Sequence, residues 1–355
     1  MLSRFGPGLA ALALGLAGGF LFQLLGIPLA WTLGALTMAA VVAVLGGRWL
    51  MPAPLRNLAR PVLEVLAGSA FTFTVAGSML AWWDAVVLVL LHSLVITLIG
   101  VVFFRRVCRF DRITAFFAAA PGGLSELTLL GASLGGHMRT LALVHSVRII
   151  TVVAVVPPLL RLVNDDITAG ATPVAAASAT LGLQDWLFLG GCALGGYLLG
   201  TFVRLPGGVM VGALLVSGAV HGLGMTEVVP PFWLVALVQV VIGSINGARF
   251  AGVTWAELRS TVLYALVWAV VMLLWSGLAA WLASLFLFDR SGWAMLLALA
   301  PGGTAEVILM SYALGIDVAF VVTCQITRIL FVLTCVPPLF PLFRGRSGGP
   351  PATTT

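Results

Sequence analysis

Charged residues are scarce in this sequence. Only 8% of its 355 residues are charged, whereas soluble domains carry about 25%. Lysine is absent, so all 18 basic residues are arginine. Hydrophobic residues make up 61% of the chain, and the mean hydropathy is +1.14. This composition excludes a soluble globular protein and predicts a chain that is embedded in lipid.

Cysteine and histidine are scarce as well. The cysteines show no CxxC spacing, so the sequence predicts neither a disulfide framework nor a metal site. The histidines have no spacing that would assemble a copper site, which excludes a copper monooxygenase. We therefore expect no cofactor, no metal and no enzymatic activity. The residues concerned are Cys108, Cys192, Cys324, Cys335, His92, His137, His145 and His221.

Long apolar runs fill most of the chain. A helix needs about 20 residues to cross a hydrocarbon core of ~30 Å. The alternating ~10-residue strands of a membrane barrel are missing, so we expect an all-α polytopic integral membrane protein. The arginines in short loops, which give a net charge of +6, indicate membrane topology and a lipid partner rather than nucleic-acid binding. The predicted spans are residues 5–25, 28–46, 58–78, 84–104, 185–203, 206–223, 232–248 and 260–287.

An internal duplication organises the sequence. Residues 120–159 align without gaps on residues 300–339, with 15 of 40 positions identical. The identities include the segment APGG at 120–123 and 300–303, which we call the APGG segments. Such self-similarity predicts two homologous membrane repeats. We expect repeat 1 at 1–163, an extracytoplasmic linker at 164–184, repeat 2 at 185–343 and a disordered cytoplasmic tail at 344–355.

The arginine distribution favours two inverted repeats of about five spans each. If each APGG segment is the turn of a re-entrant hairpin, the second half is inverted, with 14 loop arginines inside and two outside. If the segments span the membrane fully, the halves are parallel and the split is 12 to four. The positive-inside rule prefers inversion. Inverted repeats with broken helices are a recurring plan of secondary transporters, and we expect the inner membrane of a bacterium as the location.

The APGG segments are the strongest candidates for a binding site. Proline followed by two glycines should interrupt a helix, and the helix that restarts presents unpaired N–H groups that attract anions. A plainer explanation is a kinked helix with close glycine packing and no ligand. The predicted substrate-binding residues are Pro121, Gly122, Gly123, Ser125, Glu126, Arg148, Pro301, Gly302, Gly303, Glu306, Gln325 and Arg328.

Two arginines are expected at membrane depth. Arg148 and Arg328 lie about ten residues into their predicted helices, so each would be ~15 Å deep, where an isolated arginine is costly. Glu126 and Glu306 are the expected partners, within one repeat or exchanged between repeats. A buried Glu–Arg bridge that only holds the fold together is the alternative.

Two further ionisable residues are candidates for ion coupling. His145 precedes Arg148 by three residues, on the same helical face, and could carry a proton. A hydrogen-bonded core histidine explains it equally well. Glu64 lies inside an apolar run, and it could instead pair with Arg60 one turn earlier.

These motifs resemble a known family. APGG followed by Glu, a G-x-D/H turn and a helix with Q/H-x-x-R is similar to the duplicated AbrB membrane-protein family, over nearly the whole chain. The second repeat matches best, because the first has His137 and His145 in place of Asp317 and Gln325.

Family members carry labels such as putative regulator of gene expression or ammonia monooxygenase. We expect a secondary transporter or exporter of a small anionic solute, with a membrane sensor that regulates gene expression as the alternative. Glycine-rich spans, with 41 glycines in all, would permit close packing within the chain or in a homodimer.

Overall fold

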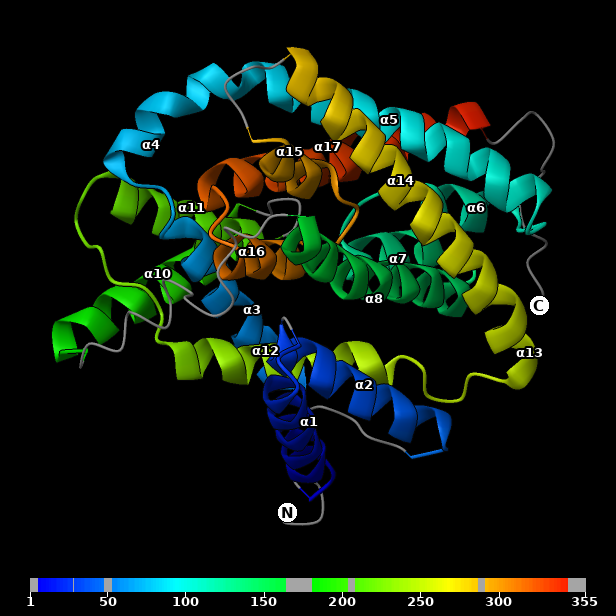
Figure 1. Cartoon of the computed structure of the whole chain (residues 1–355), viewed down its shortest axis with the longest axis horizontal. Helices are drawn as coiled ribbons and strands as arrows, with labels where there is room; N and C mark the ends of the chain where they lie inside the picture. The colour runs from blue at the N-terminus through cyan, green and yellow to red at the C-terminus, as the bar shows by residue number, and fades with distance from the viewer. Residues whose placement is uncertain are drawn as a thin grey trace.

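The computed structural model describes residues 6–27, 29–47, 53–163, 181–203, 208–286 and 291–343 (Figure 1). The described part consists of helices and loops, as the composition predicts. The predicted tail and most of the predicted linker lie outside the described residues.

The helices are α1 Gly6–Leu24, α2 Ala30–Val44, α3 Ala53–Gly68, α4 Phe73–Ser78, η2 Met79–Trp82, α5 Trp83–Arg106, α6 Arg112–Ala119, α7 Leu124–Ser133, α8 Met138–Val163, α10 Leu183–Phe202, α11 Val209–Gly222, α12 Phe232–Ala248, α13 Trp255–Glu257, η3 Leu258–Val262, α14 Leu263–Phe286, α15 Gly292–Leu299, α16 Thr304–Ala313 and α17 Val318–Phe343.

Apolar helices dominate the described chain. Three stretches are long and apolar enough to cross a membrane, at residues 83–106, 138–160 and 255–286. Five shorter apolar helices of 10–17 residues accompany them, in α1, α2, α11, α12 and the first part of α17. These helices fall on the apolar runs of the sequence and are compatible with a membrane protein.

The predicted span 58–78 is wrong as a single helix. α3 ends at Gly68, and α4 starts only at Phe73. Three contacts explain the break. Gly68 packs tightly on Ser217 of α11, the Ser217 hydroxyl donates to the Val65 carbonyl (2.8 Å), and the Tyr312 hydroxyl donates to the Leu66 carbonyl (2.6 Å). Both hydroxyls therefore bind carbonyls of the last turn of α3, where the Val65 carbonyl also accepts from the backbone N–H of Ser69 (2.9 Å).

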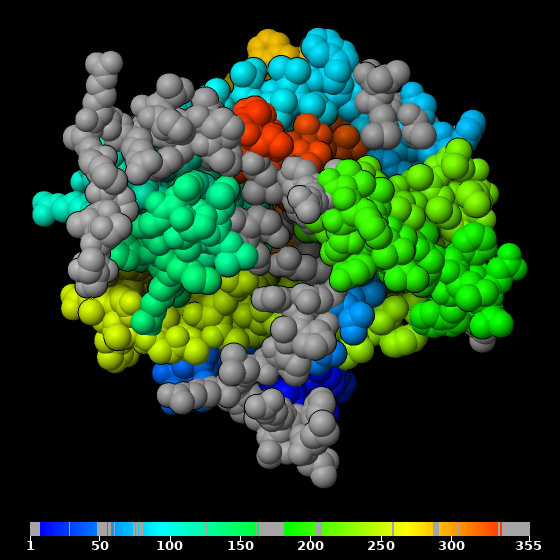
Figure 2. All heavy atoms as spheres, turned by 180° about the vertical axis from the view of Figure 1, so that it is seen from behind, coloured from blue at the N-terminus to red at the C-terminus, as the bar shows by residue number. Residues whose placement is uncertain are grey.

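The helices form two groups, and each group takes elements from both halves of the sequence. In the six-helix group, α1 and α2 pack on α12, α10 and α11 pack on α3, and α3 contacts α12. The hairpin group contains α5–α8 and α14–α17. Figure 2 shows the mixing from behind, where yellow-green residues of the second half lie between blue and blue-green residues of the first.

Helix α5 runs opposite to α14, and helix α8 runs opposite to α17 (Figure 1). Phe104 near the end of α5 packs edge-on against Trp268 near the start of α14, with ring centroids 5.7 Å apart. The start of α5 shares a hydrophobic cluster with the end of α14, and the end of α8 shares it with the start of α17. Figure 1 shows α5 (cyan) and α14 (yellow) crossing the molecule antiparallel to each other.

Helices α6 and α7 form a hairpin. Asp111 caps the first turn of α6 by accepting from the backbone N–H groups of Ile113 (3.0 Å) and Thr114 (2.9 Å). The N–H of His137, which follows α7, donates to the Thr114 hydroxyl (2.9 Å). The start of α6 and the end of α7 therefore lie side by side, with the first APGG segment at the far tip between them.

Candidate functional site

Both APGG segments interrupt a helix, as the sequence predicts. α6 ends before Ala120 (ψ 127°) and α7 begins after Gly123 (ψ 129°), while α15 ends before Ala300 (ψ 131°) and α16 begins after Gly303 (ψ 146°). All four residues are extended. Proline forces this state on the residue before it, which ends the helix and frees the last carbonyls of α6 and α15.

Each APGG segment packs on a helix of the opposite half. A Cβ atom on Gly122 would come within 3.1 Å of Val332 in α17, and one on Gly302 within 3.3 Å of Val152 in α8. Both positions would also crowd the helix that follows them, at Leu127 and Val307. An added methyl group would require these side chains to shift, so the two segments are tied to the contact between the halves.

Arg148 in α8 binds the first break. Its Nη1 donates to the Ala120 carbonyl (3.1 Å), and its Nη2 donates to the Gly122 carbonyl (2.8 Å). The side chain is 1% exposed. A guanidinium at this place satisfies freed carbonyls and lies at the negative end of the α6 dipole. Arg148 therefore acts as the cap of a broken helix.

Arg328 in α17 repeats this contact in the second break. Its Nη1 donates to the Ala300 carbonyl (2.8 Å), and its Nη2 donates to Oε1 of Gln325. The amide of Gln325 in turn donates to the Leu297 carbonyl (2.8 Å). The hydrogen bond from Arg328 to Ala300 is the counterpart of the one from Arg148 to Ala120, because both of its residues lie 180 positions later. The similarity of the two halves therefore includes this hydrogen bond.

The described hydrogen bonds of both arginines to the backbone go to carbonyls at the ends of α6 and α15 or in the APGG segments. These carbonyls belong to the break itself, where proline ends the helix. One buried N–H on each guanidinium, at Nε, makes no hydrogen bond within the described residues.

Glu306 follows the second break. It lies in the first turn of α16 and is 4% exposed. Oε1 accepts a hydrogen bond from Nδ2 of Asn246 at the end of α12 (3.2 Å), and Oε2 lies against Gly303. Its charge acts on Arg148 of the first half, so a pairing of this carboxylate with the arginine of the other repeat stays a prediction. The side chains of Ser125 and Glu126 lie outside the described residues.

The two coupling candidates lie in different groups. His145 is fully buried in the hairpin group, where it faces the backbone of Phe117 and the charge of Arg148, and neither ring nitrogen makes a hydrogen bond of normal geometry. Glu64 is buried in α3 of the six-helix group. The side chain of Arg60, its alternative partner, lies outside the described residues. The structure thus brings His145 close to Arg148.

Sequence reasoning missed two polar contacts near the breaks. Asn246 binds Glu306, and Nε2 of His92 in α5 lies 3.3 Å from the hydroxyl of Ser276 in α14. The same hydroxyl donates to the Leu299 carbonyl (3.2 Å), and His92 is in reach of the charge of Arg328. A polar residue inside an apolar run was the available signal. Within the described residues, no three His, Cys, Asp or Glu side chains gather into a metal site.

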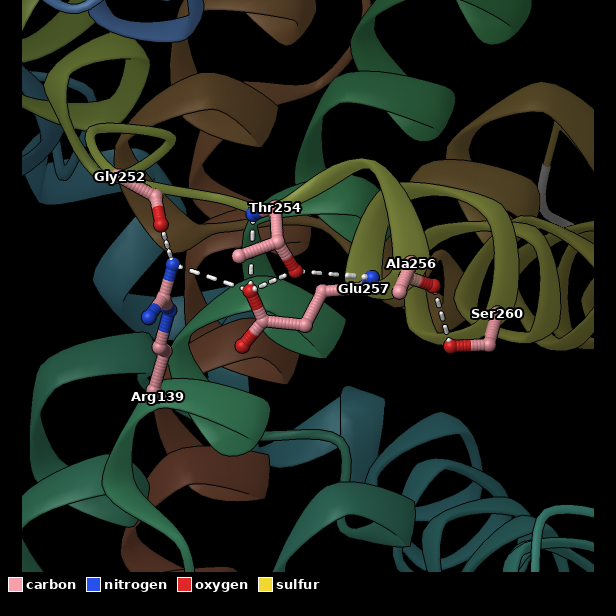
Figure 3. A network of polar contacts seen from close by, with 6 residues as sticks. All are labelled: Arg139, Gly252, Thr254, Ala256, Glu257 and Ser260. Carbon is pink, nitrogen blue, oxygen red and sulfur yellow. Dashed lines mark hydrogen bonds and ion pairs between the residues drawn. The ribbon is translucent and has the colours of Figure 1, made fainter.

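A polar network joins α8 to the second half at the molecular surface (Figure 3). Arg139 lies 3.1 Å from Oε2 of Glu257, and it also donates to the Gly252 carbonyl. The same carboxylate oxygen accepts from the backbone N–H (2.9 Å) and the hydroxyl (2.8 Å) of Thr254. The start of α8 and the start of α13 therefore lie at the same end of the molecule.

The fold and the breaks define an all-helical protein with membrane-length apolar helices and two broken-helix segments. Its residues 31–344 match the family described as "Transition state regulatory protein AbrB", and the chain belongs to this family. "Uncharacterized protein YhjN" of Bacillus subtilis (strain 168) is 27% identical over 361 residues, covering 95% of this chain and 93% of the relative. "Putative regulator AbrB" of Escherichia coli (strain K12) is 21% identical over 332 residues, covering 93% and 94%.

Proposed function

We propose that this protein is a secondary transporter that moves a small anionic organic solute across the membrane by alternating access. The observation that carries the proposal is the pair of APGG breaks, each capped by a buried arginine and packed on the opposite half. Non-helical backbone at membrane depth is tolerated where it is buried in protein or lines a cavity. Transporters use such breaks at the interface of their repeats.

Inverted repeats supply the two states that alternating access needs. The antiparallel course of α5 against α14, and of α8 against α17, supports inversion. The hairpin of α6 and α7 supports the re-entrant reading of the APGG segment, because both of its ends lie at one end of the molecule. If the halves exchange conformations about their pseudo-twofold axis, the breaks open first to one side and then to the other.

The two buried arginines favour an anionic solute. Arg148 and Arg328 are each 1% exposed, and the Nε–H of each guanidinium makes no hydrogen bond within the described residues. The two arginines also repel each other. An anion that enters between the breaks would be attracted by both guanidinium groups in a medium of low dielectric constant.

The proposal includes a cellular location and binding partners. We place the protein in the inner membrane of a bacterium, with the lipid bilayer and the solute as its partners and with a homodimer as a further assembly. Transport without chemical conversion requires neither an enzyme activity nor a cofactor. Repeats at 1–163 and 185–343 remain the proposed division of the chain, although the two spatial groups cut across it.

The experiment is a thermal-shift screen of the purified protein followed by counterflow in proteoliposomes. The panel contains acetate, lactate, succinate, citrate, benzoate and benzenesulfonate, with methylammonium and choline as cationic comparisons. We expect one or more anions to raise the melting temperature, because a ligand of the native state stabilises it by mass action. Arg328→Gln should lose this shift and the counterflow, while Arg259→Gln, at an exposed position, should retain both.

A membrane sensor that regulates gene expression is the second candidate, favoured by the words "Putative regulator" in the name of the Escherichia coli relative. A sensor needs a surface for a downstream partner, and the loop between α5 and α6 covers only residues 107–111. If all anions and both amines leave the melting temperature and counterflow unchanged, transport is rejected in favour of this candidate.

A further inference from the structure

The first turn of α16 already holds a carboxylate of the protein. Glu306 lies in this turn, and its Oε2 folds back against Gly303, the residue that caps the helix. Gly303 has no side chain and makes no side-chain cap. A helix N-terminus carries unpaired N–H groups and a partial positive charge, which a carboxylate stabilises. Glu306 thus occupies the place that an anionic solute would need.

Arg148 and Asn246 complete the surroundings of this carboxylate. Asn246 donates to Oε1 (3.2 Å), and Arg148 approaches with its charge while its Nη atoms stay on the Ala120 and Gly122 carbonyls. The Nε–H of Arg148 is buried without a hydrogen-bond acceptor among the described residues. Ile149, the next residue in α8, would lie 3.3 Å from a Cβ atom on Gly303, so this N–H belongs to a residue beside the helix end that Glu306 occupies.

The other charged or titratable side chains around α16 are few. None comes from α15, whose sequence is apolar. The described and buried ones on the other elements packed against α16 are His145 and Arg148 on α8, Arg328 and Cys324 on α17, and Glu64 on α3. The half-buried Arg249 follows α12, and the buried Tyr312 lies on α16 itself. An additional anion is tolerated better beside a neutral Glu306 than beside an ionised one, because the neutral acid does not repel it.

We propose that Glu306 couples transport to protons, and that the carboxylate of the solute replaces it at the N-terminus of α16 once Glu306 is protonated. This inference rests on the proposed transport function and names the ion that drives it. An ionised Glu306 competes with the solute for the same N–H groups and repels it. The protonated side chain is neutral, so it releases the helix end and removes the repulsion.

The cycle balances in protons and charge. In the state open to the acidic side, one proton from water binds the Glu306 carboxylate, and one solute carboxylate enters beside Arg148. The loaded protein then exchanges states. On the other side the solute leaves, Glu306 loses its proton to water and its carboxylate returns to Gly303. One proton and one negative charge move together, so transport of a monocarboxylate is electroneutral.

The first test compares affinities at two pH values. Benzenesulfonate is ionised at both pH values, so a change in its affinity does not come from a change in its own charge. We expect it, and every carboxylate that binds, to bind the wild-type protein at least tenfold more tightly at pH 5.5 than at pH 7.5. Glu306→Gln mimics the protonated acid, so it should bind equally well at both values. Glu227→Gln, which changes an exposed carboxylate, should keep the wild-type dependence.

A second measurement uses the unmodified protein and is therefore independent of how the variant folds. Addition of benzoate or benzenesulfonate to wild-type protein in weakly buffered detergent solution at pH 7.5 should remove about one proton from solution for each anion bound. Anion binding with no proton uptake, or with the same affinity at both pH values, would overturn the role of Glu306 and leave the transporter standing. Absence of binding by every anion would instead reject the transport function itself.

Discussion

At the scale of single residues, the main contacts of the two buried arginines are hydrogen bonds to backbone carbonyls. Arg148 bridges two carbonyls with one planar guanidinium, and Arg328 combines a carbonyl with the amide of Gln325. A buried carbonyl without a donor costs roughly 1–3 kcal/mol, so each arginine removes a penalty that proline creates. Any contact that they make with a solute is in addition to these hydrogen bonds.

Replacing Arg148 with lysine should test the cap. Lysine keeps the charge but offers a compact ammonium in place of a planar fork, so it cannot reach both the Ala120 and Gly122 carbonyls in the same geometry. We expect Arg148→Lys to lower the free energy of unfolding by about 1–3 kcal/mol, seen as a lower melting temperature in detergent. Arg259→Lys, at an exposed position, should change stability by less than about 0.5 kcal/mol. Equal melting temperatures for both variants would argue against the cap.

At the scale of helices, close glycine contacts recur in the two halves. Gly18 of α1 meets Gly34 of α2 through its carbonyl, and Gly196 of α10 meets Gly212 of α11 in the same way. The spacing is the same in both pairs. Small residues let membrane helices approach closely, where dispersion and weak hydrogen bonds hold them together. The pairs therefore fix the first two helices of each half as a unit.

Single methyl groups should separate these helices. A Cβ atom on Gly34 or Gly212 would collide with the backbone of the partner helix, and such overpacking typically costs about 1–3 kcal/mol. We expect Gly34→Ala and Gly212→Ala to lower the melting temperature by similar amounts. Gly190→Ala in α10, where no atom lies within 4 Å of the added Cβ, is the matched control and should be neutral or slightly stabilising. A loss of the same size in all three variants would contradict the packing argument.

The sequence predicted elements well and contacts poorly. Apolar runs bounded by glycine, proline and arginine predicted most helices within a few residues, and the proline-glycine segments predicted both breaks. The span 58–78 failed because its end is determined by hydroxyls of Ser217 and Tyr312, which are distant in sequence. The Asn246–Glu306 contact was equally hidden, since its residues are 60 positions apart. The spacing of residues within one helix predicts which of its faces is buried. It does not predict which other helix packs on that face.

At the scale of the whole molecule, several loops gather at one end. The hydrogen bond from His137 to Thr114 brings the α7–α8 loop to the start of α6, and the ion pair of Arg139 with Glu257 brings the start of α13 to the same place. In the parallel arrangement of the halves, Arg112 and Arg139 would lie on opposite sides of the membrane. The proposed inverted arrangement puts them on one side, in agreement with these contacts.

Labelling of single cysteines tests this orientation. The native Cys108 is a poor probe, because burial raises the pKa of its thiol to about 11 and little reactive thiolate forms at neutral pH. In a background without native cysteines, we expect Arg112→Cys and Arg259→Cys to react with an impermeant maleimide only from the cytoplasmic side. Leu183→Cys, which replaces a side chain that is 79% exposed, should react only from outside. Labelling of Arg259→Cys from outside would establish parallel halves instead.

The exchange of helices between the two spatial groups has a consequence for biosynthesis. α2 packs on α12, and α3 packs on α11, so the main partner of an early helix is made roughly 150–200 residues later. At about 5–20 residues per second, α2 waits on the order of 10–40 s in the bilayer with the face that will meet Gly243 and Gly247 of α12 turned toward lipid. The first half therefore remains an unfinished intermediate until the second half has been synthesised.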